Sequence, residues 1–403
     1  MLSGKHILVG ISGGIAAYKI PELIRMLIKA GAEVRVTTTR HALEFVTELT
    51  LRTLSGAPVY SDVFAAINAH ATEHISLPDW ADLMIVAPAT SNVLGKMAAG
   101  IADDALTTTF AAMRKPVVVA PAMNDKMYQH PATQQAMHTL AAYPDMLMMD
   151  CVSGDLACGT NGKGRMAEPE QIMEAVRYAL TPKTLRGKRI MLTAGPTQEK
   201  LDPVRYLSNY STGKMGYALA REAWYRGAEV TLISGPTHLS IPAVPALTTL
   251  PALNIVSVCS ASEMYEAAMQ HFPASDTAVM CAAVADYAPQ QESAVKIKRI
   301  EHEIQLPLRA NKDIAAALGE RKQAHQTVVG FALETDHEEQ HALDKLAHKH
   351  LDWLVLNSLR DAGAGFGTDT NKVTIFGSKG QKKECPLLSK EAIATCIWDT
   401  ISL

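Results

Sequence analysis

The stretch HILVGISGGIAAYKI, residues 6–20, decides the fold of the first half of this 403-residue chain. It starts as an apolar run and ends in a turn of small residues between Gly10 and Gly14. A buried parallel strand that passes through a phosphate-binding turn into a helix has this pattern. A second stretch, RIMLTAGPT at residues 189–197, repeats the arrangement. The sequence therefore begins a nucleotide-type α/β fold twice.

The composition sets limits on the class of protein. A chain of this length exceeds one ordinary core, so two domains are expected. Hydrophobic residues make up 48%, charged residues 20%, and the net charge is −3. This balance predicts a soluble globular protein that has neither nucleic acid nor a membrane as a partner, since no apolar run reaches the ~20 residues of a membrane span. The N-terminus enters a strand almost at once, so we expect no signal peptide and a cytoplasmic location.

Cysteine spacing argues against two kinds of site. The six cysteines are Cys151, Cys158, Cys259, Cys281, Cys385 and Cys396. None forms a CxxC pair, so neither a zinc site nor a disulfide framework is expected. Cys158 lies among glycines and is a candidate for chemistry.

Strands alternate with helical segments in both halves. The expected strands are 5–11, 32–37, 83–87 and 116–120, then 189–193, 228–233, 277–283, 327–332 and 351–357, with a late hairpin strand at 372–376. Helices are expected at 14–30, 213–226 and 389–402. This alternation predicts two doubly wound, Rossmann-like parallel sheets. The basic segment 181–189 is typical of a linker, so we place the domains at 1–183 and 184–403.

The first turn is not a dinucleotide fingerprint. Ser12 stands where GxGxxG requires a glycine, and the second strand ends in Thr37, Thr38 and Thr39 without an acidic residue. A serine hydroxyl with bare backbone amides suits a terminal phosphate monoester, as in FMN. A tight strand–helix turn explains the residues equally well.

Three further stretches place polar residues near expected strand ends. His74 comes shortly before the strand 83–87, Ser91 follows that strand, and Asn124 follows the next one. Cys158 lies in the glycine-rich stretch SGDLACGTNGKGRM, residues 153–166, which is typical of a flap. Singly, each has an ordinary structural explanation. Together they favour a site, because a doubly wound sheet binds ligands at this edge.

The motifs GISGGIAAYK, HISL, PATSN, PAMNDKMY and ACGTNGKGRM together resemble those of the flavin-dependent cysteine decarboxylases. More closely, the chain is similar to the bacterial bifunctional coenzyme A biosynthesis family, which fuses a phosphopantothenoylcysteine decarboxylase to a phosphopantothenate–cysteine ligase. The resemblance implies a flavodoxin-like first domain in which FMN oxidises the thiol-bearing end of the substrate, so that the carboxylate can leave.

The resemblance also implies roles for single residues. His74 matches the active-site base, Asn124 the residue that holds the substrate carboxylate, and Cys158 the acid that reprotonates the product. The candidate FMN contacts are Ser12, Gly13, Gly14, Thr39 and Ser91.

The second half shows polar loops after its strands. The long loop of TAGPTQEKLDPVRYLSNYSTGKMGYALA, residues 193–220, fails the Walker spacing because Ser208 stands in place of the first glycine. Asp286 follows a buried strand, and Lys296 lies in VKIKR shortly after it. An aspartate with nearby lysines suits a triphosphate and its Mg²⁺, although a solvated run of charges gives the same pattern.

The resemblance implies that this half couples 4′-phosphopantothenate to L-cysteine with CTP and Mg²⁺ through an acyl-cytidylate. Asn209 matches a residue needed to turn over that intermediate, and Lys296 one that stabilises charge as it forms. The positions that match CTP-binding residues are Asp286, which also faces the metal, Asn311, Asp313, Phe331, Lys345 and Lys349. The family's Lys-Asn-Pro-Asp loop is altered here to Ala310–Asp313, which puts nucleotide affinity in question.

Three alternatives stay open at this stage. A peptidyl-cysteine decarboxylase would not need the second half of the chain. A flavin-binding regulatory protein would not need the reactive residues His74, Asn124 and Cys158. A dinucleotide-dependent reductase would need the GxGxxG fingerprint, which is missing here. The resemblance further implies a homo-oligomer, a dodecamer of decarboxylase trimers and ligase dimers, in which His74 acts on FMN held mainly by a neighbour.

Overall fold

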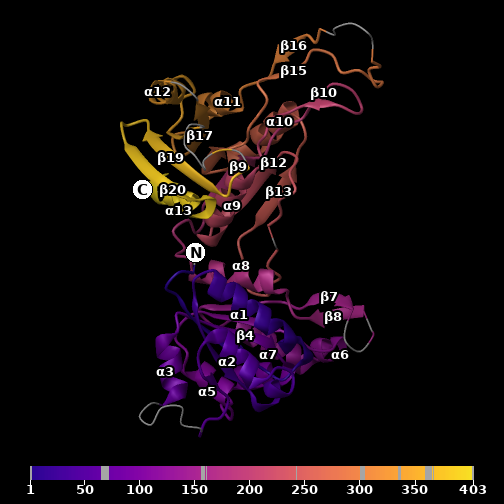
Figure 1. The fold of residues 1–403 in the computed structure, drawn as a ribbon, viewed down its shortest axis with the longest axis vertical. Coiled ribbons are helices and arrows are strands. Elements are labelled where there is room, and N and C mark those ends of the chain that lie inside the picture. Colours follow the sequence, from indigo (N-terminus) through magenta and orange to yellow (C-terminus); the bar gives the residue numbers. More distant parts are fainter. Residues whose placement is uncertain are drawn as a thin grey trace. The chain divides into compact units, whose positions relative to one another are not determined.

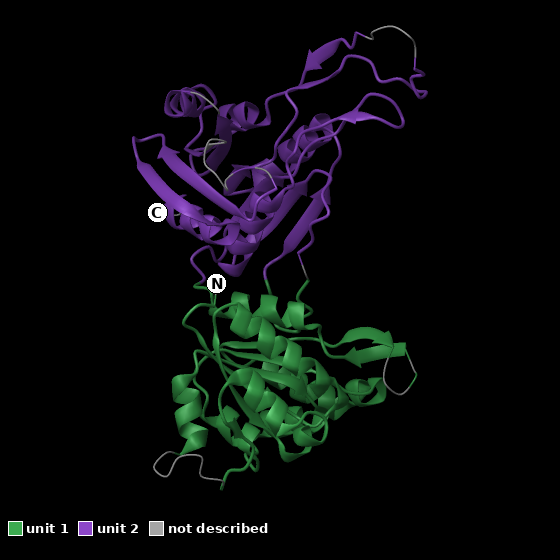
Figure 2. Cartoon of the chain, in the orientation of Figure 1, with its two compact units in different colours: residues 1–182, 242–250 green, residues 183–241, 251–403 purple. Residues whose placement is uncertain are grey.

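The computed structural model describes residues 2–64, 72–155, 159, 161–241, 243–299, 305–334, 337–358, 365 and 367–401. The chain forms two compact units, shown in different colours in Figure 2. Unit 1 contains residues 1–182 and 242–250, and unit 2 contains residues 183–241 and 251–403.

Unit 1 is built on a parallel sheet whose strands are buried on both faces. Its strands are β1 (His6–Ile11), β2 (Glu33–Thr38), β3 (Val59–Tyr60), β4 (Leu83–Ala89), β5 (Val117–Pro121) and β6 (Met146–Met148). The order is β3-β2-β1-β4-β5-β6. Without the two-residue β3, this is the flavodoxin-like order, and the strand order reverses between β1 and β4.

Helices cover both faces of this sheet (Figure 1). They are η1 (Ile15–Lys19), α1 (Ile20–Lys29), η2 (Arg40–Glu44), α2 (Glu48–Ser55), α3 (Glu73–Trp80), α4 (Ser91–Ala99), α5 (Ala105–Ala112), α6 (Asp125–Gln129), α7 (Pro131–Ala141) and α8 (Pro169–Leu180). Along β1, Ile7 and Val9 pack with α1 and α8, whereas Leu8 packs with α4, α5 and α7. Successive side chains point to opposite faces, so a continuous apolar run fills two cores. A hairpin of β7 (Val152–Asp155) and β8 (Asn161–Arg165) follows the sheet.

Unit 2 repeats the parallel order and extends it. Its main strands are β9 (Arg189–Ala194), β12 (Glu229–Ser234), β13 (Leu253–Ser257), β14 (Thr277–Met280), β17 (Thr327–Glu334), β18 (Trp353–Ser358), β19 (Thr370–Gly377) and β20 (Lys382–Ser389). The order is β13-β12-β9-β14-β17-β18-β19-β20, parallel as far as β18 and closed by an antiparallel hairpin. Both doubly wound sheets predicted from the sequence are confirmed.

The helices of unit 2 also divide between two faces. They are α9 (Lys214–Tyr225), α10 (Ala261–His271), η3 (Phe272–Ala274), α11 (Ile314–Arg321), α12 (Glu338–His348) and α13 (Lys390–Ile401). One face packs with α10, α11 and α12. The helices α9 and α13 pack together, where the Trp398 indole donates to the Leu219 carbonyl over 3.0 Å. Two short antiparallel pairs complete the unit: β10 (Glu199–Lys200) with β11 (Tyr206–Leu207), and β15 (Tyr287–Pro289) with β16 (Leu308–Ala310).

The expectation that no disulfide forms is wrong for one pair. Cys385 on β20 and Cys396 on α13 are joined by a disulfide. The hairpin strand lies next to the closing helix, which brings the two cysteines together although their spacing fits no motif.

A segment inside the second half completes the first unit. Residues 242–250 belong to unit 1, so the chain crosses between the units three times. Ala246 forms an antiparallel bridge with Met149, beside β6, and the Leu247 N–H donates to the Met148 carbonyl over 2.9 Å. Val244, Ala246 and Leu250 pack on the core of unit 1. The sequence analysis anticipated only the crossing near residue 183.

Candidate active sites

Unit 1 holds a cavity of about 1050 Å³ at the carboxyl ends of its central strands. Residues from the turn after β1, the end of β2 and the segments after β4 and β5 line it. Five predicted residues are among them: Gly13, Gly14, Thr39, Ser91 and Asn124. The cavity therefore occupies the point at which the strand order reverses, where doubly wound sheets bind ligands.

The glycine turn lies tightly against the neighbouring backbone. A Cβ built on Gly13 would lie 2.5 Å from the His41 Cβ and 2.9 Å from the His41 carbonyl carbon. A side chain at this position would have to displace backbone. The turn thus exposes main chain to the cavity, as a phosphate cradle requires.

Thr39 presents an orphaned hydroxyl to this cavity. Its Oγ1 is buried and has no hydrogen-bond partner. Buried hydroxyls are almost always paired, because leaving one unpaired costs about 1–3 kcal/mol. The Thr37 and Thr38 hydroxyls are unpaired too, but only Thr39 lines the cavity. A ligand with acceptor oxygens would satisfy Thr39.

The two predicted serines have different surroundings. The Ser12 hydroxyl donates to the Pro88 carbonyl over 2.6 Å and accepts from the Thr90 N–H over 3.0 Å. Ser12 is fully buried and does not line the cavity, so its side chain fastens the first turn to the turn after β4. Ser91 does line the cavity, and its hydroxyl lies 2.9 Å from that of Thr133.

Asn124 faces the cavity from the start of α6. Its Oδ1 accepts from the Lys126 N–H over 2.9 Å and caps the helix. The preceding residue, Met123, donates its N–H to the Gly164 carbonyl on β8 over 2.9 Å. A Cβ on Gly164 would lie 2.3 Å from the Met123 carbonyl oxygen, so only glycine permits this approach. The β7–β8 hairpin is thereby held against Asn124, while Cys158 lies outside the described residues.

His74 does not line this cavity. It belongs to α3, a helix that packs against α5, although the sequence analysis foresaw only a position before a strand. Figure 1 shows α3 and α6 on opposite flanks of unit 1. The structure therefore does not bring His74 and Asn124 together within one chain.

A three-part ion cluster beside the cavity was missed by the sequence analysis. Glu168, the residue before α8, accepts from the Lys19 ammonium over 2.7 Å and from the Arg165 guanidinium over 2.9 Å. Lys19 and Arg165 line the cavity. The hydrogen bond from Lys19 and the charge of Arg165 hold the pKa of Glu168 below its ordinary value. Lys19 is far in sequence from Arg165 and Glu168, so no local pattern signals the whole cluster.

Unit 2 holds a cavity of about 670 Å³ at the carboxyl ends of β9, β14 and β17. It gathers six predicted residues: Asp286, Asn311, Asp313, Phe331, Lys345 and Lys349. The start of α9 contributes Ser211 to Gly216 to the same wall.

Hydrogen bonds and an ion pair hold Asn311 and Asp313 in place in the cavity wall. The Asn311 N–H donates to the Asp286 carbonyl, and its side-chain amide donates to the Ala285 carbonyl, each over 2.8 Å. Asp313 caps α11 and pairs with Lys349 over 2.8 Å. Burial works to raise the pKa of Asp313, but the Ala316 N–H and Lys349 outweigh it and hold that pKa below its ordinary value.

Two predicted residues of unit 2 do not line the cavity: Asn209 and Lys296. The Asn209 amide donates to the Ala283 carbonyl over 2.7 Å, and its Oδ1 accepts from the Ser211 N–H over 3.0 Å. Asn209 thus holds the loop before α9 against the segment after β14. Lys296 is exposed on the segment after β15.

The sequence analysis missed a second group of residues in this cavity. Lys214, Cys281, Asn371 and Lys390 line it. Burial raises the pKa of the Cys281 thiol to about 12. Lys390 opens the closing helix far along the chain, and only the packing of α13 on α9 places it here.

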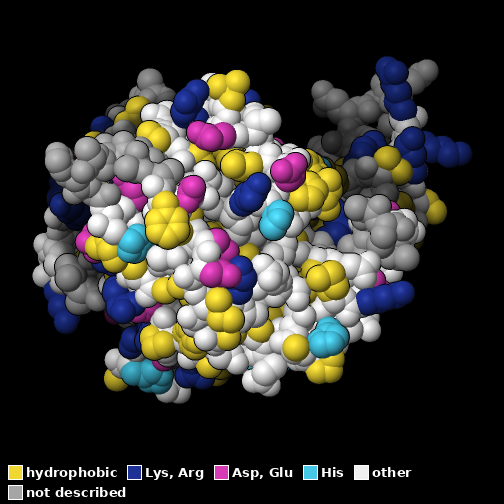
Figure 3. Space-filling model, turned by 90° about the horizontal axis from the view of Figure 1, so that it is seen from below, with side chains coloured by type: hydrophobic (Ala, Val, Ile, Leu, Met, Phe, Trp, Pro, Cys, Tyr) yellow, Lys and Arg dark blue, Asp and Glu magenta, His cyan; other side chains and the backbone are white. Residues whose placement is uncertain are grey.

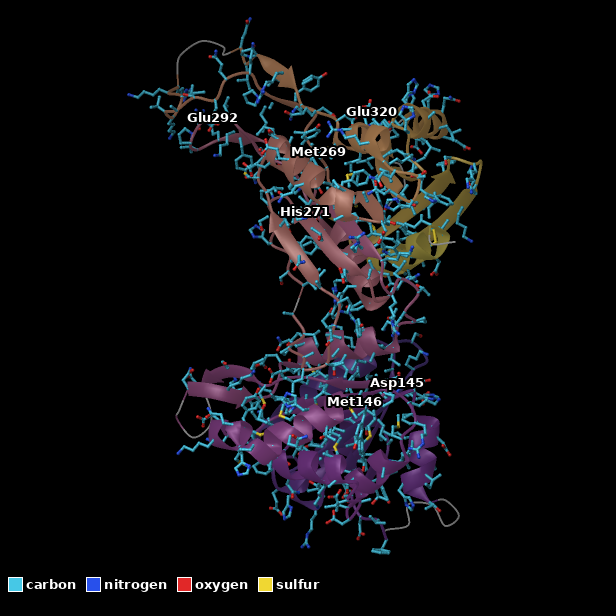
Figure 4. The ribbon with its side chains drawn as sticks, turned by 180° about the vertical axis from the view of Figure 1, so that it is seen from behind. Asp145, Met146, Met269, His271, Glu292 and Glu320 are labelled. Atoms are coloured by element: carbon cyan, nitrogen blue, oxygen red, sulfur yellow. A yellow bond between two sulfur atoms is a disulfide. The ribbon has the colours of Figure 1, made fainter. Side chains whose placement is uncertain are left out.

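The remaining features add no predicted residue to a site. Asp145 and Met146, labelled in Figure 4, line a third cavity of about 480 Å³ at the amino ends of β5 and β6.

Among the described residues, no cluster of three or more histidine, cysteine or acidic side chains could hold a metal. No helix in the described part of the chain combines the length and apolar character that a membrane span needs. In Figure 3, basic and acidic side chains are interspersed with hydrophobic ones across the visible face.

Comparisons with known proteins cover nearly the whole chain. A flavoprotein family model matches residues 1–181, and the model of the DNA/pantothenate metabolism flavoprotein C-terminal domain matches residues 185–403. The Coenzyme A biosynthesis bifunctional protein CoaBC of Bacillus subtilis is 46% identical over 394 residues, 97% of this chain and 95% of that protein. Its Vibrio cholerae namesake is 43% identical over 99% of this chain and 98% of that protein. A Cysteine/Cysteine sulfinic acid decarboxylase from an unknown prokaryotic organism is 45% identical over 87% of this chain and 97% of that protein.

Proposed function

The chain belongs to the family of coenzyme A biosynthesis bifunctional proteins, and from this premise we propose that it makes 4′-phosphopantetheine in two consecutive reactions. Unit 2 joins 4′-phosphopantothenate to L-cysteine, and unit 1 removes the carboxylate of the resulting phosphopantothenoylcysteine. The observation that carries the proposal is the near full-length similarity to CoaBC proteins, with one ligand-edge cavity in each unit.

The residues of the unit 1 cavity fit FMN. The orphaned Thr39 hydroxyl and the exposed main chain of the Gly13 turn suit its phosphate. Bound FMN supplies the two-electron oxidation and the later reduction that the decarboxylation requires. Asn124 donates its amide hydrogens to the substrate carboxylate, and Cys158 supplies the proton that completes the product.

We propose that His74 acts as the base toward a cavity of a neighbouring copy. Its position on α3, outside the cavity of its own chain, supports this arrangement. A complete decarboxylase site then requires a homo-oligomer, for which we keep the dodecamer of trimers and dimers as the proposal. We further propose that the enzyme works in the cytoplasm.

For unit 2 we propose CTP as the activating nucleotide. A carboxylate oxygen of 4′-phosphopantothenate attacks the α-phosphorus, pyrophosphate leaves, and the amine of L-cysteine then displaces CMP from the acyl-cytidylate. Asp286 binds Mg²⁺ together with the phosphates, since this cation prefers oxygen ligands and retains several waters. Phe331 packs on the base, while Lys345 and Lys349 attract the nucleotide.

Asn209 and Lys296 complete the proposed ligase site from outside the cavity lining. Asn209 keeps the loop before α9 in place through its contacts with Ala283 and Ser211. Lys296 adds positive charge from an exposed segment, which would have to approach the substrate during the reaction. In the altered loop Ala310–Asp313, the Lys312 ammonium lies 4.6 Å from the centre of the Tyr265 ring, so it already has a partner within the chain.

One assay tests both halves. Purified protein receives 4′-phosphopantothenate, L-cysteine, Mg²⁺ and CTP, and pyrophosphate and CO₂ are followed together after its flavin absorption is recorded. We expect a yellow protein that releases both products. Pyrophosphate without CO₂ would contradict the decarboxylase assignment, and no pyrophosphate would contradict the ligase assignment. Release of CO₂ from free L-cysteine without CTP would instead favour the activity named for the cysteine decarboxylase relative.

A further inference from the structure

Five lysines line the unit 2 cavity, and they differ in how their charge is balanced. They are Lys214, Lys312, Lys345, Lys349 and Lys390. Three pair with carboxylates of the chain: Lys214 with Asp369, Lys345 with Glu334 and Lys349 with Asp313. Lys312 lies over the Tyr265 ring. Four of the five cations therefore already have a partner that balances or screens their charge.

Lys390 differs from the other four. It is the first residue of α13 and only 6% exposed. Its ammonium donates to the backbone carbonyls of Thr368 and Gly365, the latter over 3.3 Å. Within the described part of the chain, no carboxylate lies within ion-pair distance of it. The carboxylates of Asp369 and Glu391 act on Lys390 only from beyond that distance, and Asp369 is already paired with Lys214. The charge of this buried ammonium is therefore only partly balanced, which is costly unless a ligand adds negative charge.

The surroundings of Lys390 favour an anion rather than a neutral ligand. The Lys214 ammonium is close enough to lower the pKa of Lys390, in addition to the larger effect of burial. The first turn of α9 lines the same cavity, and the backbone N–H groups at a helix start have no partner within the helix and favour an anion. The carbonyl partners of Lys390 only accept hydrogen bonds, so they stabilise the charged ammonium rather than a neutral amine that could act as a base.

We propose that Lys390 binds the β- and γ-phosphates of the nucleoside triphosphate, the part that leaves as pyrophosphate. This inference rests on the proposed ligase function. When the carboxylate oxygen bonds to the α-phosphorus, the bond from that phosphorus to the bridging oxygen breaks, and its electron pair stays on pyrophosphate. Lys390 stabilises the charge that develops there, at the opposite side of the reacting phosphorus from the attacking carboxylate.

Nucleotide binding to the full-length chain distinguishes this role from a structural one. We would titrate CTP and CMP, each with Mg²⁺ and without 4′-phosphopantothenate, into the wild type and Lys390→Gln. CMP lacks the β- and γ-phosphates. We expect K390Q to weaken CTP binding by about 10- to 100-fold, as for a lost charge-assisted hydrogen bond, and to leave CMP binding within about twofold. Lys390→Arg keeps the charge and should restore most of the affinity for CTP.

Lys183 offers a matched control in the same unit. Its ammonium also donates to a backbone carbonyl, that of Tyr225, over 3.0 Å, and burial lowers its pKa to about 8. It does not line the cavity, so Lys183→Gln should leave CTP affinity unchanged. Equal weakening of CTP and CMP by K390Q would overturn the proposal in favour of a structural role, and so would unchanged CTP binding. A wild-type chain that binds neither nucleotide would overturn the ligase function itself.

Discussion

Asn124 uses one carboxamide for two purposes, which a substitution can separate. Its Oδ1 caps α6, and its side chain faces the unit 1 cavity. Aspartate caps helices as well as asparagine does, but it would place a negative charge beside the substrate carboxylate. We predict that Asn124→Asp keeps the free energy of unfolding within about 0.5 kcal/mol and lowers CO₂ release at least about 100-fold. Urea unfolding and a decarboxylation assay measure the two effects.

A cap in the other unit gives the control for this experiment. Ser260 caps α10 through its Oγ, which accepts from the Glu263 N–H over 3.2 Å. Ser260→Ala should cost about 1 kcal/mol of stability with no change in CO₂ release. Full decarboxylation by N124D would exclude Asn124 as the group that holds the carboxylate.

Single residues also show which positions in a cavity a sequence pattern can indicate and which it cannot. Gly13, Thr39 and Asn124 line the unit 1 cavity, and the sequence indicated this position because each follows an apolar run typical of a strand. Lys390 gave no such signal, since its place in the cavity depends on how α13 packs against α9. Ser12 was predicted as a ligand contact; its hydroxyl bonds the turn after β4 and does not line the cavity, which depends on packing that the sequence does not show.

Three elements of unit 1 converge on Glu168. Its carboxylate links η1 through Lys19 and β8 through Arg165 to the start of α8. Its folded-state pKa is lower than the ~4.3 of an unfolded chain, so this linkage stabilises the fold above about pH 4 and is lost as the pH falls through the folded-state pKa. We predict that Glu168→Gln is less stable than the wild type at pH 7, by under about 1 kcal/mol because the side chains are partly exposed. The difference should shrink to nothing toward pH 3 in urea unfolding.

An exposed ion pair of unit 2 serves as the comparison. Glu339 pairs with Lys382 over 2.9 Å, with both side chains well exposed. Glu339→Gln should change stability less than E168Q at pH 7. A stability difference for E168Q that persists unchanged at pH 3 would show that the ion pairs are not its cause.

At the scale of elements, buried strands were predictable, whereas largely exposed or very short strands were not. The sequence analysis missed β13 and the eight-residue β20, whose side chains are mostly exposed and so give no apolar run. The strands β1, β4 and β9 are six or seven residues long, and apart from the first residue of β1 and of β9 all their residues are buried. The two-residue strands β3, β10 and β11 carry too few residues for any periodicity. The Cys385–Cys396 disulfide depends on the contact of β20 with α13, so its cysteine spacing could not reveal it.

For the whole molecule, the placement of α3 predicts that decarboxylation needs two chains. His74→Ala and Asn124→Ala should each abolish CO₂ release alone. When the two variants are co-expressed, about a quarter of the sites should combine an intact His74 with an intact Asn124 from a neighbour and recover activity. Assays of the purified mixed oligomer, tagged on each variant, measure this recovery.

A second mixture tests whether the recovery arises for another reason. Asn124→Ala co-expressed with N124D offers no site with an intact Asn124 and should stay inactive. A mixed oligomer of the first pair that releases no CO₂ would mean that His74 serves its own chain.

The three crossings between the units make a second prediction for the whole molecule. A fragment of residues 1–182 lacks the Leu247 N–H that bonds Met148, the Pro245 carbonyl that bonds Asp150, and the apolar side chains of 242–250. We predict that it is less stable than unit 1 in the full chain by about 2–4 kcal/mol. A peptide of residues 242–250 should restore part of the loss in thermal unfolding, and a scrambled peptide should not. No difference between the two peptides would show that the segment is dispensable.

The placement of 242–250 also fixes an order of events during synthesis. When residues 1–182 have been synthesised, every strand of the first sheet has been made, yet the segment that pairs beside β6 has not. β9, α9 and β12 must emerge first. The N-terminal unit therefore cannot complete its native contacts until part of the other unit has been synthesised.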